Sequence, residues 1–203
     1  MSLEQQFGAI DIYLFDQLLR GRITAQDRVF DAGCGWGRNL IYLLRSGCEV
    51  FGVDSDPEAI AEVRSLARRL APSLPEDNFR AEPIERMTFP DGFATVVVSS
   101  AVLHFANDDA QFEAMLEGSW RRLAPGGMFF CRLASTIGLE DRVRPLTAGS
   151  RRCVLPDGTH RYLVDEALLM KYTHRLGGQL LDPIKTTVVQ DQRSMTTWVV
   201  RKN

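Results

Sequence analysis

The sequence predicts an α/β fold: a doubly wound, mostly parallel sheet of seven strands, with helices on both faces and a C-terminal antiparallel hairpin. First, short apolar runs alternate with amphipathic segments along the chain, which is typical of parallel strands joined by helices. Second, a glycine-rich turn at residues 31–37 joins a predicted strand to a predicted helix. Third, two strand-like runs at 179–189 and 194–201 flank a short polar turn, which predicts the hairpin.

The remaining elements follow from local patterns. Apolar residues at helical spacing predict an amphipathic helix over residues 10–19. Asp56 is expected to cap a helix that has Pro57 in its first turn and stops before Pro72. The other predicted strands lie at 28–32, 49–53, near 79, 95–99 and 128–134, and the other predicted helices at 37–46, 108–123 and 165–176.

Length and composition limit the class of protein. With 203 residues, 45% of them hydrophobic, the chain is expected to form one domain over residues 1–203 that buries roughly 70% of its unfolded surface. The net charge of −2 argues against nucleic-acid and membrane partners. No segment resembles a signal peptide or membrane span, so we expect a cytoplasmic protein. The four cysteines lack C-x-x-C spacing, which argues against zinc and disulfides.

The glycine-rich turn, Asp31-Ala-Gly-Cys-Gly-Trp-Gly37, indicates a site for a nucleoside-containing cofactor. Glycines let the backbone turn sharply and approach a ligand, and the start of the following helix offers free N–H groups. Asp54 ends the next predicted strand, where it can accept hydrogen bonds from a ribose.

Two features of the turn distinguish a dinucleotide from S-adenosylmethionine. The third glycine of a dinucleotide fingerprint allows close packing between helix and strand, but that position is Arg38 here. Asp31 would repel a pyrophosphate and attract the ammonium group of a methionine moiety. The acidic residues therefore favour S-adenosylmethionine, with its ammonium group near Asp31 and its ribose near Asp54.

With these features the chain resembles the class I S-adenosylmethionine-dependent methyltransferases, whose fold is Rossmann-like. Residues 31–37 and 53–56 look like the first two motifs of that family. Residues 87–104 look like the run through its fourth strand, and 123–130 like the entry to its fifth. These motifs follow family order and indicate a cofactor-binding core at 28–135. The compact size and N-terminal lead-in look similar to small-molecule methyltransferases of the tellurite-resistance and ubiquinone-biosynthesis types.

The resemblance implies a set of cofactor-binding residues. Many relatives carry an acid for the exocyclic amine of adenine after the third strand, but Pro83 holds that place here, with Glu82 and Glu85 nearby. Which glutamate reaches the amine stays open, whereas Ile84 is expected to offer its backbone N–H. The implied set is Asp31, Gly33, Cys34, Gly35, Trp36, Asp54, Ser55, Glu82, Ile84 and Ser99.

Methyl transfer requires few catalytic groups, because the cofactor already carries an activated methyl group. A general base is needed only when the acceptor arrives protonated. His104, beyond the fourth strand, is a candidate base, and the alternative is a structural histidine that packs the loop. Residues 1–22 are expected to carry a lid helix on which Tyr13 covers the cofactor, and the alternative is an ordinary packing aromatic. No metal is expected.

The connection at residues 136–164 suggests the nature of the methyl acceptor. It follows the fifth strand and is expected to form a flap on the acceptor side, with a hairpin turn at 156–159. Between residues 140 and 161 it carries five arginines and three acids. Arg151 and Arg152 are therefore predicted to bind a small anionic acceptor, and the alternative is an exposed loop with ordinary surface arginines.

Three functions are consistent with these patterns. The favoured function is S-adenosylmethionine-dependent methyl transfer to a small molecule, catalysed mainly by proximity. The second is an S-adenosylmethionine-binding sensor or partner subunit without transfer activity. The third, a nicotinamide-dependent oxidoreductase, is disfavoured by Asp31 and Arg38.

Overall fold

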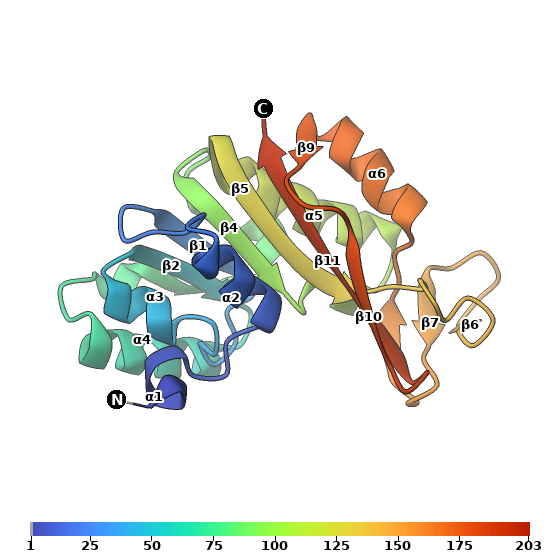
Figure 1. The fold of residues 1–203 in the computed structure, drawn as a ribbon, viewed down its shortest axis with the longest axis horizontal. Coiled ribbons are helices and arrows are strands. Elements are labelled where there is room, and N and C mark those ends of the chain that lie inside the picture. Colours follow the sequence, from blue (N-terminus) through green and yellow to red (C-terminus); the bar gives the residue numbers. More distant parts are fainter. Residues whose placement is uncertain (1) are drawn as a thin grey trace.

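The computed structural model describes residues 2–203 and shows a mixed sheet between layers of helices (Figure 1). Seven strands follow the order β10-β11-β5-β4-β1-β2-β3, and a short eighth strand, β9, also pairs with β11. The first five strands are parallel, whereas β11 runs antiparallel to β5, β9 and β10. The predicted α/β fold with its C-terminal hairpin is therefore confirmed. The strands are β1 Arg28–Ala32, β2 Glu49–Asp54, β3 Phe79–Ala81, β4 Ala94–Ser100, β5 Leu123–Ala134, β9 Gly178–Leu180, β10 Lys185–Val189 and β11 Arg193–Lys202.

The order of the strands creates a position at which the chain changes direction across the sheet. From β1 the chain builds outward through β2 to β3, and it then returns to the other side of β1 to form β4 and β5. Helices on opposite faces leave a crevice beside the carboxyl ends of the strands at such a position. The loops that follow β1, β2 and β4 meet there, and these are the loops that carry the predicted cofactor residues.

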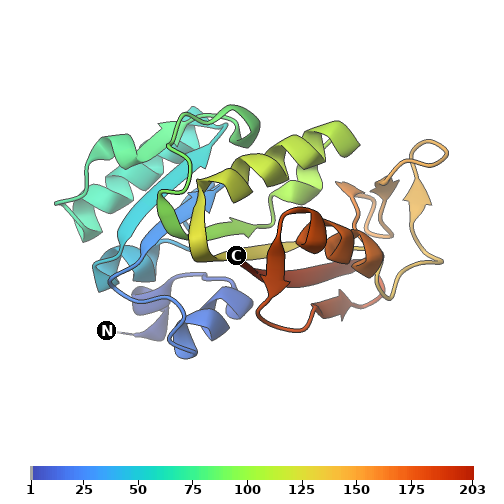
Figure 2. The same ribbon diagram turned by 90° about the horizontal axis from the view of Figure 1, so that it is seen from above.

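Helices cover both faces of the sheet because strand side chains alternate between two apolar clusters. Phe30, Val97 and Phe129 belong to the cluster that includes residues of α5 and α6. Val29 and Phe130 belong to the cluster that includes residues of α2, α3 and α4. Figure 2 shows α2 and α5 on opposite sides of the sheet. The helices are α1 Leu3–Phe7, α2 Ile12–Leu19, α3 Ile41–Ser46, α4 Pro57–Leu70, α5 Asp109–Arg122 and α6 Glu166–Arg175.

Several boundaries differ from the predicted ones. The helix expected from residue 37 begins at Ile41, because residues 33–40 form turns and Gly37 has a φ of 77°. The strand expected at 128–134 begins at Leu123. The strand expected at 179–189 is interrupted at Pro183, which has no N–H to donate to a ladder. By contrast, α4 begins as predicted, with the Asp56 side chain accepting a hydrogen bond from the Glu58 N–H.

The connection after β5 forms a small antiparallel sheet at one end of the molecule (Figure 1). Its strands are β6 Arg144–Pro145, β7 Arg152–Val154 and β8 His160–Tyr162. The predicted hairpin turn at 156–159 joins β7 to β8, with Asp157 accepting hydrogen bonds from the Thr159 N–H and hydroxyl. Among the described residues, no helix has the length and apolar character needed to cross a membrane.

Candidate active site

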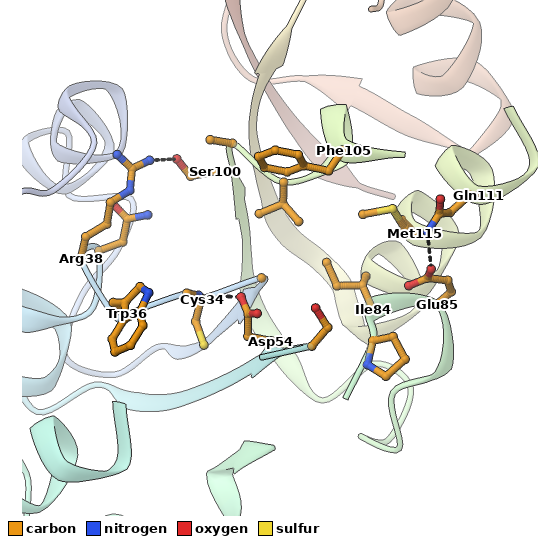
Figure 3. Close-up of a pocket in the computed structure, with 17 residues that line it drawn as sticks. Cys34, Trp36, Arg38, Asp54, Ile84, Glu85, Ser100, Phe105, Gln111 and Met115 are labelled. Carbon is orange, nitrogen blue, oxygen red and sulfur yellow. Dashed lines mark hydrogen bonds between the residues drawn. The ribbon is translucent and has the colours of Figure 1, made fainter. Parts of the chain in front are cut away.

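A cavity of about 670 Å³ opens at the carboxyl ends of β1, β2 and β4 (Figure 3). Its walls come from the glycine-rich turn, the end of β2, the segment after β3, the segment after β4 and the start of α5. The side chains and backbone that line it belong to Gly33, Cys34, Gly35, Trp36, Arg38, Asn39, Asp54, Ser55, Pro83, Ile84, Glu85, Ser100, Ala101, Val102, Phe105, Gln111 and Met115. Of the ten residues implied for the cofactor, seven lie on this wall, and Asp31, Glu82 and Ser99 do not.

Hydrogen bonds to β2 hold the glycine-rich turn in place. The N–H groups of Gly33 and Cys34 donate to the Val53 carbonyl at 2.9 Å each. Gly33 has a φ of 92°, and a Cβ at this position would lie 2.5 Å from Cγ2 of Val102. At Gly35, by contrast, a Cβ would meet nothing within 4 Å. The turn is thus packed tightly on one side and open to the cavity on the other.

Asp31 lies buried beneath the turn without a hydrogen-bond partner. The residue is 1% exposed, and neither carboxylate oxygen has a partner among the described residues. Burial raises the pKa of Asp31 to about 7, although the nearby Arg38 opposes the shift and Asp54 adds to it. A buried carboxylate without a donor favours a cationic partner.

Asp54 lies on the cavity wall at the end of β2. Its Oδ2 accepts a hydrogen bond from the Gly35 N–H at 2.8 Å, and its Oδ1 accepts one from the Asp56 N–H at 3.0 Å. A carboxylate has about four acceptor positions, so Asp54 retains capacity for hydroxyl donors of a ligand. Trp36 also borders the cavity and is 61% exposed.

The structure distinguishes the two glutamates that the sequence left open. Glu82 is directed away from the cavity, because its carboxylate accepts hydrogen bonds from the N–H and hydroxyl of Thr88 at 2.7 and 2.6 Å. Glu85 lines the cavity and accepts a hydrogen bond from Nε2 of Gln111 at 2.8 Å (Figure 3). Ile84 and Met115 form an apolar wall beside it.

Ser100, rather than the predicted Ser99, faces the cavity. Neighbouring residues of a strand point to opposite faces, and Ser99 is fully buried beside Cys131 of β5. The Ser100 hydroxyl accepts a hydrogen bond from Nη2 of Arg38 at 3.0 Å and donates one to Oδ2 of Asp11 at 3.0 Å. Four residues that were not predicted from the sequence also line the cavity: Arg38, Asn39, Ser100 and Phe105. For Ser100, the alternation of side chains along β4 is a sequence signal that could have indicated it.

Neither candidate catalytic residue lines the cavity. His104 is 5% exposed, and its Nδ1 accepts a hydrogen bond from the Ala134 N–H at 3.1 Å. Burial, with Arg161 and Arg132 nearby, lowers the pKa of His104 to about 3, so the imidazole is neutral near pH 7. The Tyr13 hydroxyl hydrogen bonds to the Thr187 hydroxyl at 2.5 Å. These contacts hold His104 against the end of β5 and Tyr13 against β10.

His104 is expected to make stability fall in acid. The unfolded chain gains a proton at His104 below about pH 6.5, whereas the folded protein gains it only near pH 3. Between these values the free energy of unfolding decreases as pH falls, by up to about 1.4 kcal/mol per pH unit. Gln can accept the Ala134 N–H without titrating, so His104→Gln should gain stability relative to wild type as pH falls from 7 to 4.5 in urea unfolding. The exposed His174→Gln is the control, and a pH-independent difference for His104→Gln would contradict the assignment.

The arginines predicted to bind the acceptor make other contacts. Nη1 of Arg151 pairs with Oδ2 of Asp165 at 2.9 Å, and Nη1 of Arg152 donates to the Ala106 carbonyl at 2.6 Å and to the Phe105 carbonyl at 3.2 Å. The guanidinium of Arg161 lies 4.8 Å from the ring centroid of Phe105. The small sheet therefore approaches the cavity through Phe105 and contributes no lining residue of its own.

The segment that builds the cavity matches a known family. A family model described as a methyltransferase domain matches residues 30–131, which is half of the chain. The chain belongs to the methyltransferase domain family. The resemblance to class I S-adenosylmethionine-dependent methyltransferases, inferred from the four motifs, is confirmed. Among the described residues, no group of three or more His, Cys, Asp or Glu side chains is placed to hold a metal ion.

Individual relatives agree with this membership. The chain is 30% identical over 107 residues to an uncharacterized methyltransferase of Synechocystis, covering 53% of this chain and 47% of that protein. It is 27% identical over 161 residues to a ubiquinone biosynthesis O-methyltransferase of Xanthomonas euvesicatoria, covering 76% of this chain and 64% of that protein. The chain thus spans about half to two thirds of these relatives. A solved S-adenosylmethionine-dependent methyltransferase of Methanosarcina mazei has the same fold, with a TM-score of 0.71 at 19% identity over 91% of this chain and 96% of that one.

Proposed function

We propose that this protein transfers the methyl group of S-adenosylmethionine to a small, anionic acceptor. The observation that carries the proposal is the partnerless buried carboxylate of Asp31, which lies beneath a glycine-rich turn at the edge of the cavity. A cofactor with a cationic amino-acid group at one end and a ribose in the middle supplies the partner that Asp31 lacks and hydroxyl donors for the remaining acceptor positions of Asp54.

Asp31 beneath the turn and several residues of the cavity wall fit successive parts of this cofactor. Asp31 would hold the ammonium group, and the open backbone at Gly35 allows the amino-acid group to approach. Asp54 would accept hydrogen bonds from the ribose hydroxyls. Pro83, Ile84 and Met115 offer an apolar slot for the adenine, whose amine Glu85 would bind. Bound in this way, the cofactor supplies a methyl group on a positively charged sulfur, ready for displacement.

The residues of the cavity can position the reactants, but they offer few groups for proton transfer. Among the described residues on the cavity wall there is no histidine, tyrosine or lysine, and the two carboxylates, Asp54 and Glu85, lie at the adenosine end. Holding the acceptor atom in line with the methyl group and excluding water can supply most of the rate. An acceptor that arrives as an anion or with a free lone pair needs no base.

The arginines around Phe105 support an anionic acceptor. Arg161 stacks near the Phe105 ring, Arg152 holds the Phe105 carbonyl, and Arg38 lines the cavity. Because Arg151 and Arg152 are engaged elsewhere, we assign the acceptor contact to Arg161, which does not line the cavity itself but contacts Phe105 on the cavity wall. Its Nη1 donates to the neighbouring His160 carbonyl, and its other donors can bind an anionic group beside Phe105.

Methyl-labelled S-adenosylmethionine tests this function with a panel of thiols, carboxylic acids, heteroaromatic amines and alcohols. We expect label in an anionic acceptor. Arg161→Gln should raise the KM for that acceptor about 10- to 150-fold, because a hydrogen bond to a charged group contributes about 1.5–3 kcal/mol, and kcat should change little. Arg144→Gln, on the exposed strand β6 of the same small sheet, is the matched control.

Two outcomes would contradict the proposal at different points. Failure of S-adenosylmethionine to raise the thermal midpoint of unfolding would refute the cofactor. Clear stabilisation without methyl transfer to any acceptor would favour the binding protein without transfer activity.

A further inference from the structure

Phe105 is an aromatic residue that the segment after β4 presents to the cavity (Figure 3). The residue is 54% exposed, although phenylalanine side chains are usually buried. It shares the cavity wall with a second exposed aromatic residue, Trp36. A large apolar side chain that stays open inside a cavity is typical of a surface that a ligand covers.

The segment that carries Phe105 is fixed by hydrogen bonds rather than by burial of the ring. Ala101 has a φ of 64°, a left-handed conformation that is uncommon for residues with a side chain and is often found at binding sites. Its N–H donates to the Arg132 carbonyl at 2.7 Å. The Phe105 N–H donates to the Val102 carbonyl at 2.9 Å, and the Phe105 carbonyl accepts a hydrogen bond from Nη1 of Arg152 at 3.2 Å. The ring is therefore held at the cavity before any ligand arrives.

The positive charge beside Phe105 indicates what kind of ligand would cover it. The guanidinium of Arg161 lies 4.8 Å from the centroid of the Phe105 ring. A guanidinium stacks on aromatic faces and also binds a carboxylate with two parallel hydrogen bonds. An aromatic acid can use both properties and can also stack on Phe105, whereas a saturated acid of the same size uses only the charge. Trp36, by contrast, lies in the glycine-rich turn, among groups assigned to the cofactor.

We propose that the methyl acceptor is an aromatic acid, whose ring stacks on the open face of Phe105 while its anionic group binds Arg161. This inference rests on the proposed function and deepens it, because it names the chemical class of the acceptor. A lone pair of the acceptor takes the methyl group as the bond between methyl and sulfur breaks, and the products are the methylated acid and S-adenosylhomocysteine. Phe105 selects the ring, and Arg161 selects the charge.

The test compares two acids that share a carboxylate and a similar size but differ in aromatic character. Isothermal titration calorimetry measures the dissociation constants of naphthoate and of its fully saturated analogue, decalin carboxylate, for the protein complexed with S-adenosylhomocysteine. Wild type should bind naphthoate about 2- to 12-fold more tightly, which is the effect expected for one aromatic pair. Phe105→Leu keeps an apolar side chain and should lose this preference, whereas Phe105→Tyr should keep it.

Two further variants separate the ring from its surroundings. Arg161→Gln should weaken the binding of both acids by the same factor, because the two carry the same charge. Leu146→Ala changes an exposed apolar residue that does not line the cavity, so it should bind both acids as wild type does.

Each contrary result has its own meaning. If the complex with S-adenosylhomocysteine forms but binds neither acid, or binds decalin carboxylate as tightly as naphthoate, the inference is overturned while the proposed cofactor stands. If Trp36→Leu abolishes the preference and Phe105→Leu does not, the assignment to Phe105 is overturned. If S-adenosylhomocysteine itself does not bind, the proposed function fails and this inference fails with it. The comparison of the two acids on wild type decides the question even if Phe105→Leu does not fold.

Discussion

Asp31→Asn is expected to weaken binding of S-adenosylmethionine at pH 8 by about 30- to 150-fold. The variant keeps the size of the side chain but removes the charge that faces the ammonium group, and losing one partner of a buried charge pair costs about 2–3 kcal/mol or more. Calorimetric titration at pH 8 checks the expectation. Asp141→Asn, an exposed aspartate outside the cavity, should bind as wild type.

The pH dependence of the same variant gives an independent check. The pKa of Asp31 is raised to about 7 in the folded protein, above the value of about 3.9 for an exposed aspartate. Between these values the folded state holds a proton that the unfolded state has lost, so stability without ligand falls as pH rises from about 4 to about 7. Asp31→Asn should therefore gain stability relative to wild type over this range. Wild-type affinity for the cofactor should rise toward pH 7 as the carboxylate ionises, whereas the affinity of Asp31→Asn should not. If the difference in stability between wild type and Asp31→Asn did not change with pH, Asp31 would not be a buried carboxyl group that holds its proton up to about pH 7.

Gly33→Ala is expected to be the most damaging substitution in the glycine-rich turn. Its Cβ would lie 2.5 and 2.6 Å from the two Cγ atoms of Val102, at a φ of 92°. Overpacking and backbone strain together cost about 2–5 kcal/mol, which for a chain of this size lowers the thermal midpoint by about 5–15 °C. Because Val102 lines the cavity, cofactor affinity should fall as well.

A matched pair of variants separates the clash from the strain. Gly35→Ala also has a positive φ, 50°, but its Cβ would meet nothing within 4 Å. It should therefore lose much less stability than Gly33→Ala in a thermal scan. Adding Val102→Ala to Gly33→Ala should restore part of the loss. Equal losses at the two glycines, or no rescue by Val102→Ala, would show that the contact with Val102 is not the cause.

The parts of the site that lie within one loop could be predicted from the sequence. The glycine-rich turn and Asp54 each follow a strand, and their side chains or backbone reach the cavity through local geometry alone. The two glutamates beside Pro83 could not be ranked in this way. Their choice depends on Thr88, which binds Glu82, and on Gln111 of α5, which contacts Glu85.

Side chains whose partners lie in distant segments of the chain could not be assigned from the sequence either. Arg151 and Arg152 were assigned to an acceptor from local charge, but their partners, Asp165 and the carbonyls of Phe105 and Ala106, come from other segments. The side chain of Arg38 contacts Ser100 at the end of β4 and Asp11 at the start of α2, both far from it in the sequence. Contacts between side chains far apart in the sequence have no periodicity or spacing that a sequence pattern can reveal.

The sequence by itself determined the α/β architecture, the order of the family motifs along the chain and the family. Short apolar runs, amphipathic segments and glycine-rich turns are local properties of the chain. The tertiary structure alone decided that Ser100 rather than Ser99 faces the cavity, that Glu85 rather than Glu82 borders it, and that His104 is a neutral, buried support. Each of these depends on which face of an element packs against a distant neighbour, and burial by that neighbour then sets the hydrogen bonds and charge states of the site.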